Sequence, residues 1–328
     1  MKKAFIAALF VAVLASALLA AGSQDERQFV ADHPGKVSVT ISRHVNSETP
    51  AALAAAFEAN LRRMRDLLVA GPMFNPPLGV QVLGGLSPNS DSPEPSAPHA
   101  PIVSTGFIQF YPYIVDRKSG LPVLFRFSTA EVNVSVNWPR ASLEPNISEG
   151  QTYFYLEPER VGEMAGFPVY RRRDGDHILV MTRGKPPWVP VTREEFVSLW
   201  LRIHQKNAAG NARDTITPKV VEAHKAALAS MTAEERRMPA RYFRFNMMQP
   251  MLAPVGSTQG DPLVKANLDS FDTTVPRSAI QLISLRFQYA GDLDFDRPAS
   301  TCSVDVLRVW QMLQTSDWRA IGAALTQK

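Results

Sequence analysis

Near its N-terminal end the chain has an alternation of apolar and polar residues, followed by apolar residues at helical spacing. In residues 36–43 the apolar Val37, Val39 and Ile41 alternate with polar residues, which is the period of a strand with one buried face. The next segment has apolar residues three or four positions apart up to Gly71, with Thr49 placed to cap its first amides and Pro50 suited to its first turn. This pattern predicts a strand and then an amphipathic helix. The apolar stripe of that helix consists of Leu53, Phe57, Leu61, Met64 and Leu68.

Strand patterns dominate the middle of the chain. The segments with strand character are 102–115, 121–128, 132–138, 152–156 and 177–181. Residues 116–120 have the composition of a hairpin connection, and polar residues such as Asn133 alternate with apolar ones in the third strand. None of the connections has a helical pattern, whereas parallel strands need a crossover segment. The prediction is an antiparallel sheet with one face in water.

Helical patterns are concentrated in the C-terminal half. Thr192 with Glu195, and Thr232 with Glu235, have the spacing of a capping box. Together with the strands, these helices predict an α+β fold built on a largely antiparallel sheet with flanking helices. The expected helices are 192–210, 217–231, a short one after Thr232, 304–314 and 318–325, and one more strand is expected at 279–289.

A proline-rich segment interrupts the N-terminal half. Residues 86–101 contain five prolines among serine, asparagine, aspartate and alanine, a composition too polar and too broken to bury a core face. We interpret it as a surface loop or linker. It separates an N-terminal strand–helix–strand segment, 23–85, from a main α+β region, 102–328, and the two are expected either to form one domain or to fold apart.

The first 22 residues have the pattern of a cleavable secretory signal peptide. Lys2 and Lys3 precede an apolar run that only Ser16 interrupts, and small residues lead to an expected cleavage site after Gly22. An uncleaved membrane anchor is the alternative, but the run is rich in alanine, which partitions weakly into hydrocarbon. We therefore expect a periplasmic or secreted protein that begins at Ser23.

Composition limits the classes of partner. Without Lys2 and Lys3, basic residues outnumber acidic ones by only two, so charge gives no reason to expect nucleic acid. No other apolar run reaches the length of a membrane span, so no integral span is expected once the signal is removed. Cys302 is the only cysteine, which rules out a disulfide within the chain.

A search for catalytic motifs is negative. The chain has no nucleophile elbow, phosphate loop, dinucleotide fingerprint or two-histidine zinc motif, and no cofactor is expected. Three alternate aspartates, Asp292, Asp294 and Asp296, resemble the start of a calcium-binding loop. Arg297 stands where the turn glycine belongs and Ser303 where the bidentate glutamate belongs. These aspartates are therefore weak metal candidates, and a solvated turn is the favoured interpretation.

Other residues offer chemistry only if the fold brings them together. His204 and His224 lie on separate predicted helices, where they could meet or remain ordinary surface histidines. Trp188 follows two prolines and could stack on a sugar ring as a ligand-binding residue, although packing under the next helix is the commoner arrangement. The basic run 171–173 could meet an anion, but the acidic residues just after it favour a solvated hairpin end.

Two functional hypotheses follow from these patterns. The first is a soluble exported binding or interaction module whose partner is an envelope or extracellular ligand. The alternative is a cell-envelope hydrolase without a known motif, with the aspartates at 292–296, or Glu194 and Glu195, as its acids and bases. Adjacent residues on a helix point in different directions, so Glu194 and Glu195 are not expected to face each other.

Overall fold

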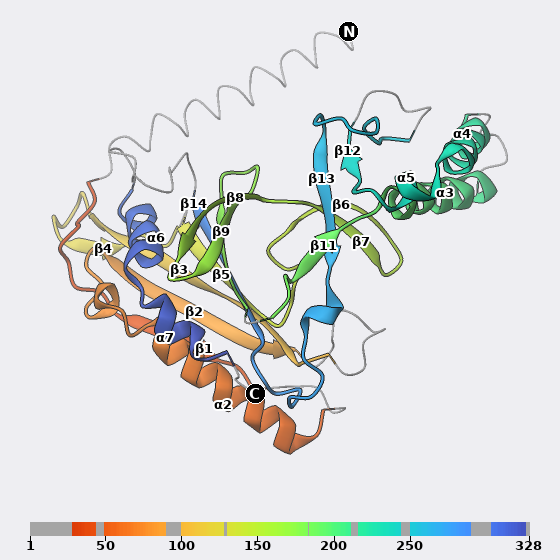
Figure 1. Cartoon of the computed structure of the whole chain (residues 1–328). Helices are drawn as coiled ribbons and strands as arrows, with labels where there is room; N and C mark the ends of the chain where they lie inside the picture. Colours follow the sequence, from red (N-terminus) through yellow and green to blue (C-terminus); the bar gives the residue numbers. More distant parts are fainter. Residues whose placement is uncertain are drawn as a thin grey trace, which may run out of the picture.

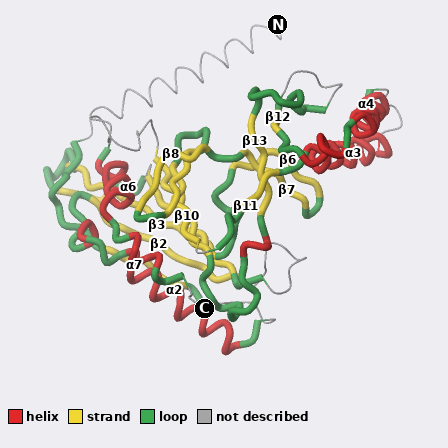
Figure 2. Tube along the Cα trace, viewed as in Figure 1, coloured by secondary structure: helices red, strands yellow, loops and turns green. Residues whose placement is uncertain are grey.

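The computed structural model describes most of the chain. The described ranges are 28–43, 49–89, 100–127, 130–182, 184–210, 216–243, 250–289 and 303–325. The expected signal peptide, Asp292, Asp294, Asp296 and Cys302 lie outside them. Within these ranges the fold is α+β, as predicted, with two sheets made mainly of antiparallel strands and with most helices in the C-terminal half (Figures 1 and 2).

The larger sheet has nine strands. Along its main path the order is β1-β2-β3-β5-β14-β10-β9-β8, and β4 pairs with the far end of β3. All pairs are antiparallel except β1 with β2, which the intervening helix α2 connects as a crossover. The strands are β1 (Val37–Ile41), β2 (Val80–Asn89), β3 (Val103–Val115), β4 (Pro122–Leu124), β5 (Ala130–Val136), β8 (Glu159–Met164), β9 (Phe167–Arg171), β10 (His177–Thr182) and β14 (Leu282–Tyr289).

Three helices cover one face of this sheet: α2 (Ala51–Leu68), α6 (Val304–Thr315) and α7 (Trp318–Gly322). Four of the five predicted stripe residues of α2 are fully buried, and the fifth packs against the same core. Burying such apolar side chains stabilises the fold by about 1.5–3 kcal/mol each. The main core therefore lies on the helix side of the sheet, which leaves the polar residues of the same strands on the other side.

The smaller sheet has five strands and its own helical cover. Its order is β11-β13-β7-β6, with β12 paired to β13. Side chains of α3 pack on it in a second hydrophobic cluster. The elements are β6 (Glu144–Glu149), β7 (Thr152–Leu156), β11 (Trp188–Pro190), β12 (Arg241–Tyr242), β13 (Asp261–Ala266), α3 (Arg193–Gly210), α4 (Thr217–Ser230) and α5 (Ala233–Arg237).

A third hydrophobic cluster joins the two sheets. Ile178 and Val180 of β10 meet Tyr155 of β7 and Val264 of β13 in it, and Trp188 lies among them. Because these side chains occupy the non-helix face of β10, the smaller sheet covers that end of the larger one. On the same non-helix face of the larger sheet, the surface formed by β3, β5 and the C-terminal half of β14 lies outside this cluster.

Two of the three predicted helix caps and the predicted hairpin are present in the structure. Both predicted capping-box contacts at Thr192 are present, and α5 begins with a complete box at Thr232. The hairpin between β3 and β4 is also confirmed. The expected cap at Thr49 is wrong, because Pro50 is the N-cap of α2 and the helix has no side-chain cap.

The proline-rich segment begins later than its composition suggested. Strand β2 continues through Pro88 to Asn89, paired with β3 throughout. Pro88 is tolerated because β1 has already ended at Ile41, opposite Leu86, so no second strand needs the missing amide. Residues 90–99 lie outside the described residues. The pairing of β2 with β3 places segments from both sides of the proline-rich stretch in one sheet.

Candidate functional site

The non-helix side of the larger sheet carries a continuous set of polar side chains. Directly paired residues point to the same face of a sheet, and the strand register aligns Phe107 with Asn133 and Asn133 with Arg286. The neighbouring row aligns Gln109, Glu131 and Gln288. We call this surface the polar face. It consists of Phe107, Gln109, Tyr111, Glu131, Asn133, Arg286 and Gln288.

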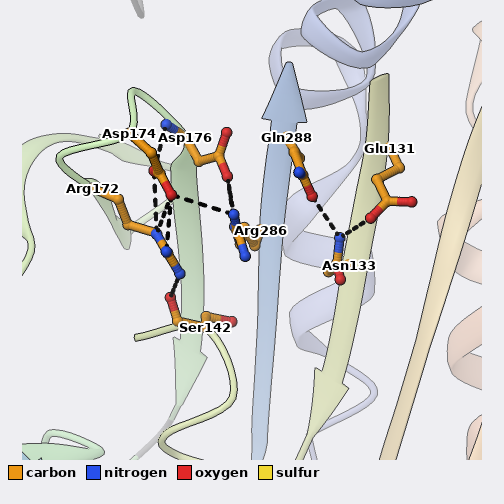
Figure 3. Close-up of polar contacts among 8 residues, drawn as sticks. All are labelled: Glu131, Asn133, Ser142, Arg172, Asp174, Asp176, Arg286 and Gln288. Carbon is orange, nitrogen blue, oxygen red and sulfur yellow. Dashed lines mark hydrogen bonds and ion pairs between the residues drawn. The ribbon is translucent and has the colours of Figure 1, made fainter. Parts of the chain in front are cut away.

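Hydrogen bonds between side chains organise the polar face across three strands. The Tyr111 hydroxyl donates to Gln109 Oε1 at 2.5 Å, and Gln109 Nε2 donates to Glu131 at 2.9 Å. Asn133 Nδ2 donates to the other carboxylate oxygen of Glu131 at 2.7 Å and lies 3.4 Å from Gln288 Oε1 (Figure 3). Such a network holds amide and carboxylate groups in fixed orientations before any ligand arrives.

An aromatic ring lies beside this network. Phe107 is 45% exposed, and on its other side it pairs with Gly85, which has no side chain to cover it. A half-exposed phenyl ring next to fixed amides offers an apolar surface and directional hydrogen bonds in one place. That combination is suited to a ligand with an apolar face and hydroxyl groups on its edge.

An ionic cluster borders the polar face at the turn between β9 and β10. Arg286 donates to Asp176 at 2.6 Å and lies 3.4 Å from Asp174. Arg172 binds Asp174 and also donates to the Ser142 carbonyl at 3.0 Å (Figure 3). The two arginines and the two aspartates therefore balance each other, so the cluster fixes Arg286 in place without adding net charge.

Asp176 is the buried member of this cluster. It is 3% exposed, and burial raises the pKa of its carboxyl, although Arg286 and its hydrogen bond oppose the rise. The ionised form of Asp176 is therefore stabilised mainly by the guanidinium of Arg286. This arrangement restricts Arg286 to one position at the edge of the polar face.

No family model, curated protein or solved structure matches this chain.

A cleft of about 470 Å³ lies beside the β9–β10 turn. Arg171, Arg172 and Arg173 line it together with Glu144, Glu157 and Glu159. Arg171 binds Glu159 at 2.7 Å, and Arg173 forms an ion pair with Asp261. The basic run is thus a hairpin end, and each of its arginines has an acidic partner.

Glu157 is a carboxyl of this cleft with a shifted pKa. Desolvation raises the pKa of Glu157 while the charge of Arg241 opposes the rise. A raised pKa lets a carboxyl hold its proton to higher pH, which is the direction that general-acid catalysis requires. The sequence around Glu157 contains no catalytic motif, so only the fold makes Glu157 a candidate.

The candidates named from the sequence have diverse environments. Trp188 is 6% exposed and makes an edge contact with Tyr170, with ring centroids 5.2 Å apart. It packs in the cluster between the two sheets and not under the next helix, and ligand binding by Trp188 stays a prediction. Glu195 belongs to the capping box and forms an ion pair with Lys265. Glu194 binds Arg236 at 2.9 Å instead of facing Glu195.

The fold does bring His204 and His224 together. Their ring centroids are 5.1 Å apart, and His204 stacks on Trp200. His224 is 2% exposed, with Nδ1 2.8 Å from the Val220 carbonyl. Within the described residues, no group of three or more potential metal ligands occurs, so the pair lacks the further ligands of an ordinary zinc site there.

The histidine pair predicts a stability loss in acid. Burial lowers the pKa of both rings from 6.5, and the neighbouring His224 lowers the pKa of His204 further. Because the unfolded chain takes up protons that the folded chain resists, stability is complete above pH 6.5 and falls as the pH drops through the folded pKa values. Urea denaturation at several pH values measures this loss.

The control for this prediction is His204→Phe. Phenylalanine keeps the stack on Trp200 but does not titrate, so the variant should lose less stability between pH 7 and pH 5 than the wild type. An equal loss in both proteins would show that other groups cause it.

Among the described residues, no helix is both long enough and apolar enough to cross a membrane.

Proposed function

We propose that this protein is an exported binding protein that holds a hydroxyl-rich ligand, such as a glycan of the cell envelope, on the polar face. The observation that carries the proposal is the side-chain network from Tyr111 to Gln288 beside the half-exposed ring of Phe107. Export is part of the same proposal, and it rests on Lys2, Lys3 and the apolar run after them.

The chemistry of the polar face supports a sugar over a charged ligand. Hydroxyl groups both donate and accept, and the amides of Gln109, Asn133 and Gln288 offer both kinds of partner. The positive charge of Arg286 is matched by two aspartates. The apolar side of a sugar ring would contact Phe107, and its hydroxyls would bind the amides beside it.

Calorimetric titration with soluble envelope-glycan fragments tests this proposal. The full chain should bind one fragment class, and Asn133→Leu should weaken that binding at least about tenfold, because a hydrogen bond to a charged network contributes about 1.5–3 kcal/mol. The matched control is Thr40→Ala, because Thr40 lies in the same row of the sheet, on β1. This variant should bind the fragment like the wild type. Equal binding by Asn133→Leu would remove the polar face as the site.

A second candidate function is hydrolysis in the cleft beside the β9–β10 turn. The observation that favours it is the raised pKa of Glu157 in a cleft that also holds Glu144. In this reaction Glu157 would protonate the leaving group and Glu144 would activate water.

Product analysis with the same glycan fragments separates the two functions. Hydrolysis predicts that Glu157→Gln slows product formation about 100-fold or more while leaving binding intact. Glu163→Gln is the matched control, because Glu163 is an exposed carboxylate on β8 that only pairs with Arg160. If the wild-type protein forms no product, the hydrolytic function is wrong.

A further inference from the structure

A cavity of about 440 Å³ lies among the helices that accompany the smaller sheet. These helices, α3, α4 and α5, gather at one end of the molecule (Figure 1). The segment 250–255 closes one side of it. Its apolar walls come from Ala223, Ala227, Met231, Leu252 and Val255. The short alanine side chains on α4 leave the space that longer residues would fill.

Arg193 brings a positive charge to this cavity. Its Nη1 donates to the Ala253 carbonyl at 2.7 Å. Its Nε is buried and has no hydrogen-bond partner among the described residues. Burial lowers the pKa of this guanidinium, but an arginine keeps its charge in proteins. Because Nε has almost no accessible surface, Arg193 acts on a ligand in this cavity through the charge of its guanidinium.

Glu235 supplies the opposite charge in the same cavity. Its Oε2 accepts the Thr232 amide at 2.7 Å, and hydrogen bonds from Thr232 lower the pKa of this carboxyl, so it is ionised at neutral pH. Arg193 and Glu235 influence each other electrostatically, yet within the described residues no direct ion pair joins them. One cavity therefore presents a cation, an anion and an apolar wall.

We propose that this cavity binds a free α-amino acid with an apolar side chain. The ligand carboxylate lies against the guanidinium of Arg193, the ligand ammonium binds Glu235, and the apolar side chain contacts Met231 and Leu252. Opposite charges on the ligand then match opposite charges in the cavity. This site is separate from the polar face and does not depend on the function proposed there.

Calorimetry of the full chain with L-leucine tests the ligand class. Leucine should bind, whereas 4-methylpentanoate, which lacks the ammonium, and 3-methylbutylamine, which lacks the carboxylate, should each bind at least about tenfold more weakly. No binding of leucine would overturn the proposal. Equal binding of 4-methylpentanoate would overturn the assigned role of Glu235 and, with it, the amino-acid class.

Three variants test the residues. Arg193→Gln and Glu235→Gln should each weaken leucine binding at least about tenfold, and glutamine preserves the capping box at position 235. Arg237→Gln removes a charge from an exposed position of α5 and should leave binding unchanged.

Ala227→Leu fills the cavity without altering charge and should abolish binding, so a folding defect in Arg193→Gln would not leave the site undecided. Leucine binding that persists in Ala227→Leu would overturn the proposed location.

Discussion

Asn137→Leu should destabilise the fold by about 4 kcal/mol or more. Asn137 is 2% exposed and directly follows strand β5. Its Nδ2 donates to the carbonyls of Ile102 and Ala279, and its Oδ1 accepts the amides of Gln281 and Leu282, all between 2.8 and 3.1 Å. Leucine removes the partner of all four backbone groups, of which three are in buried hydrogen bonds and the Gln281 amide in a partly buried one, at about 1–3 kcal/mol for each buried group in the absence of relaxation.

The backbone at Asn137 adds to this cost. Its φ of 56° lies in the left-handed region, which asparagine tolerates better than leucine does. Urea denaturation measures the loss, with Asn60→Ala as the matched control, because Asn60 makes one partly buried hydrogen bond to the Ser278 carbonyl. The control should lose about 1 kcal/mol, and an equally small loss in Asn137→Leu would contradict the structural role of Asn137.

Gly106→Ala should cost about 3 kcal/mol, at the upper end of the usual overpacking range. A Cβ at this position of β3 would overlap the carbonyl oxygen of Gly85 and lie 2.8 Å from Leu86 Cα. Both contacts are with backbone atoms of β2, which pairs with β3 along its whole length. Neither strand can move away without breaking that ladder.

Gly85→Ala is the control from the paired strand. Its Cβ would meet the nearest atom, Thr40 Oγ1, at an ordinary 3.6 Å, and neither glycine has a positive φ. We expect this variant to be neutral or to gain about 0.4–1 kcal/mol through the unfolded chain. Thermal and urea unfolding of the two variants measure the difference, and similar stabilities would contradict the close approach of β2 and β3.

Local periodicity predicted the helices and most strands of the larger sheet, because each of those elements carries its own signal. It missed β8 and β9, and it grouped 152–156 with these strands although β7 belongs to the smaller sheet. The stripe of α2 and the two capping boxes depend on residues only a few positions apart. The antiparallel arrangement followed from the absence of crossover helices in the middle of the chain. Alternation around Asn133 also indicated the solvent-facing side on which the polar face lies.

The smaller sheet and the sites depend on distant residues, which local patterns do not connect. Strand β11 pairs with β13, and Val189 meets Lys265 far along the chain; both strands are short and contain proline, so neither has a clear strand pattern. The partners Asn133 and Arg286 likewise come from strands that only the fold makes neighbours. Burial of Trp188 was predictable only as one of two alternatives.

The most direct test of the central claim is nuclear magnetic resonance of side-chain amides during titration with an envelope-glycan fragment. Binding at the polar face predicts that the resonances of Gln109, Asn133 and Gln288 shift together and saturate at one affinity. The amide of Asn60, which bonds to Ser278 elsewhere in the fold, should stay in place. Saturable binding that leaves the three polar-face amides unmoved would contradict the assignment of the ligand to this surface.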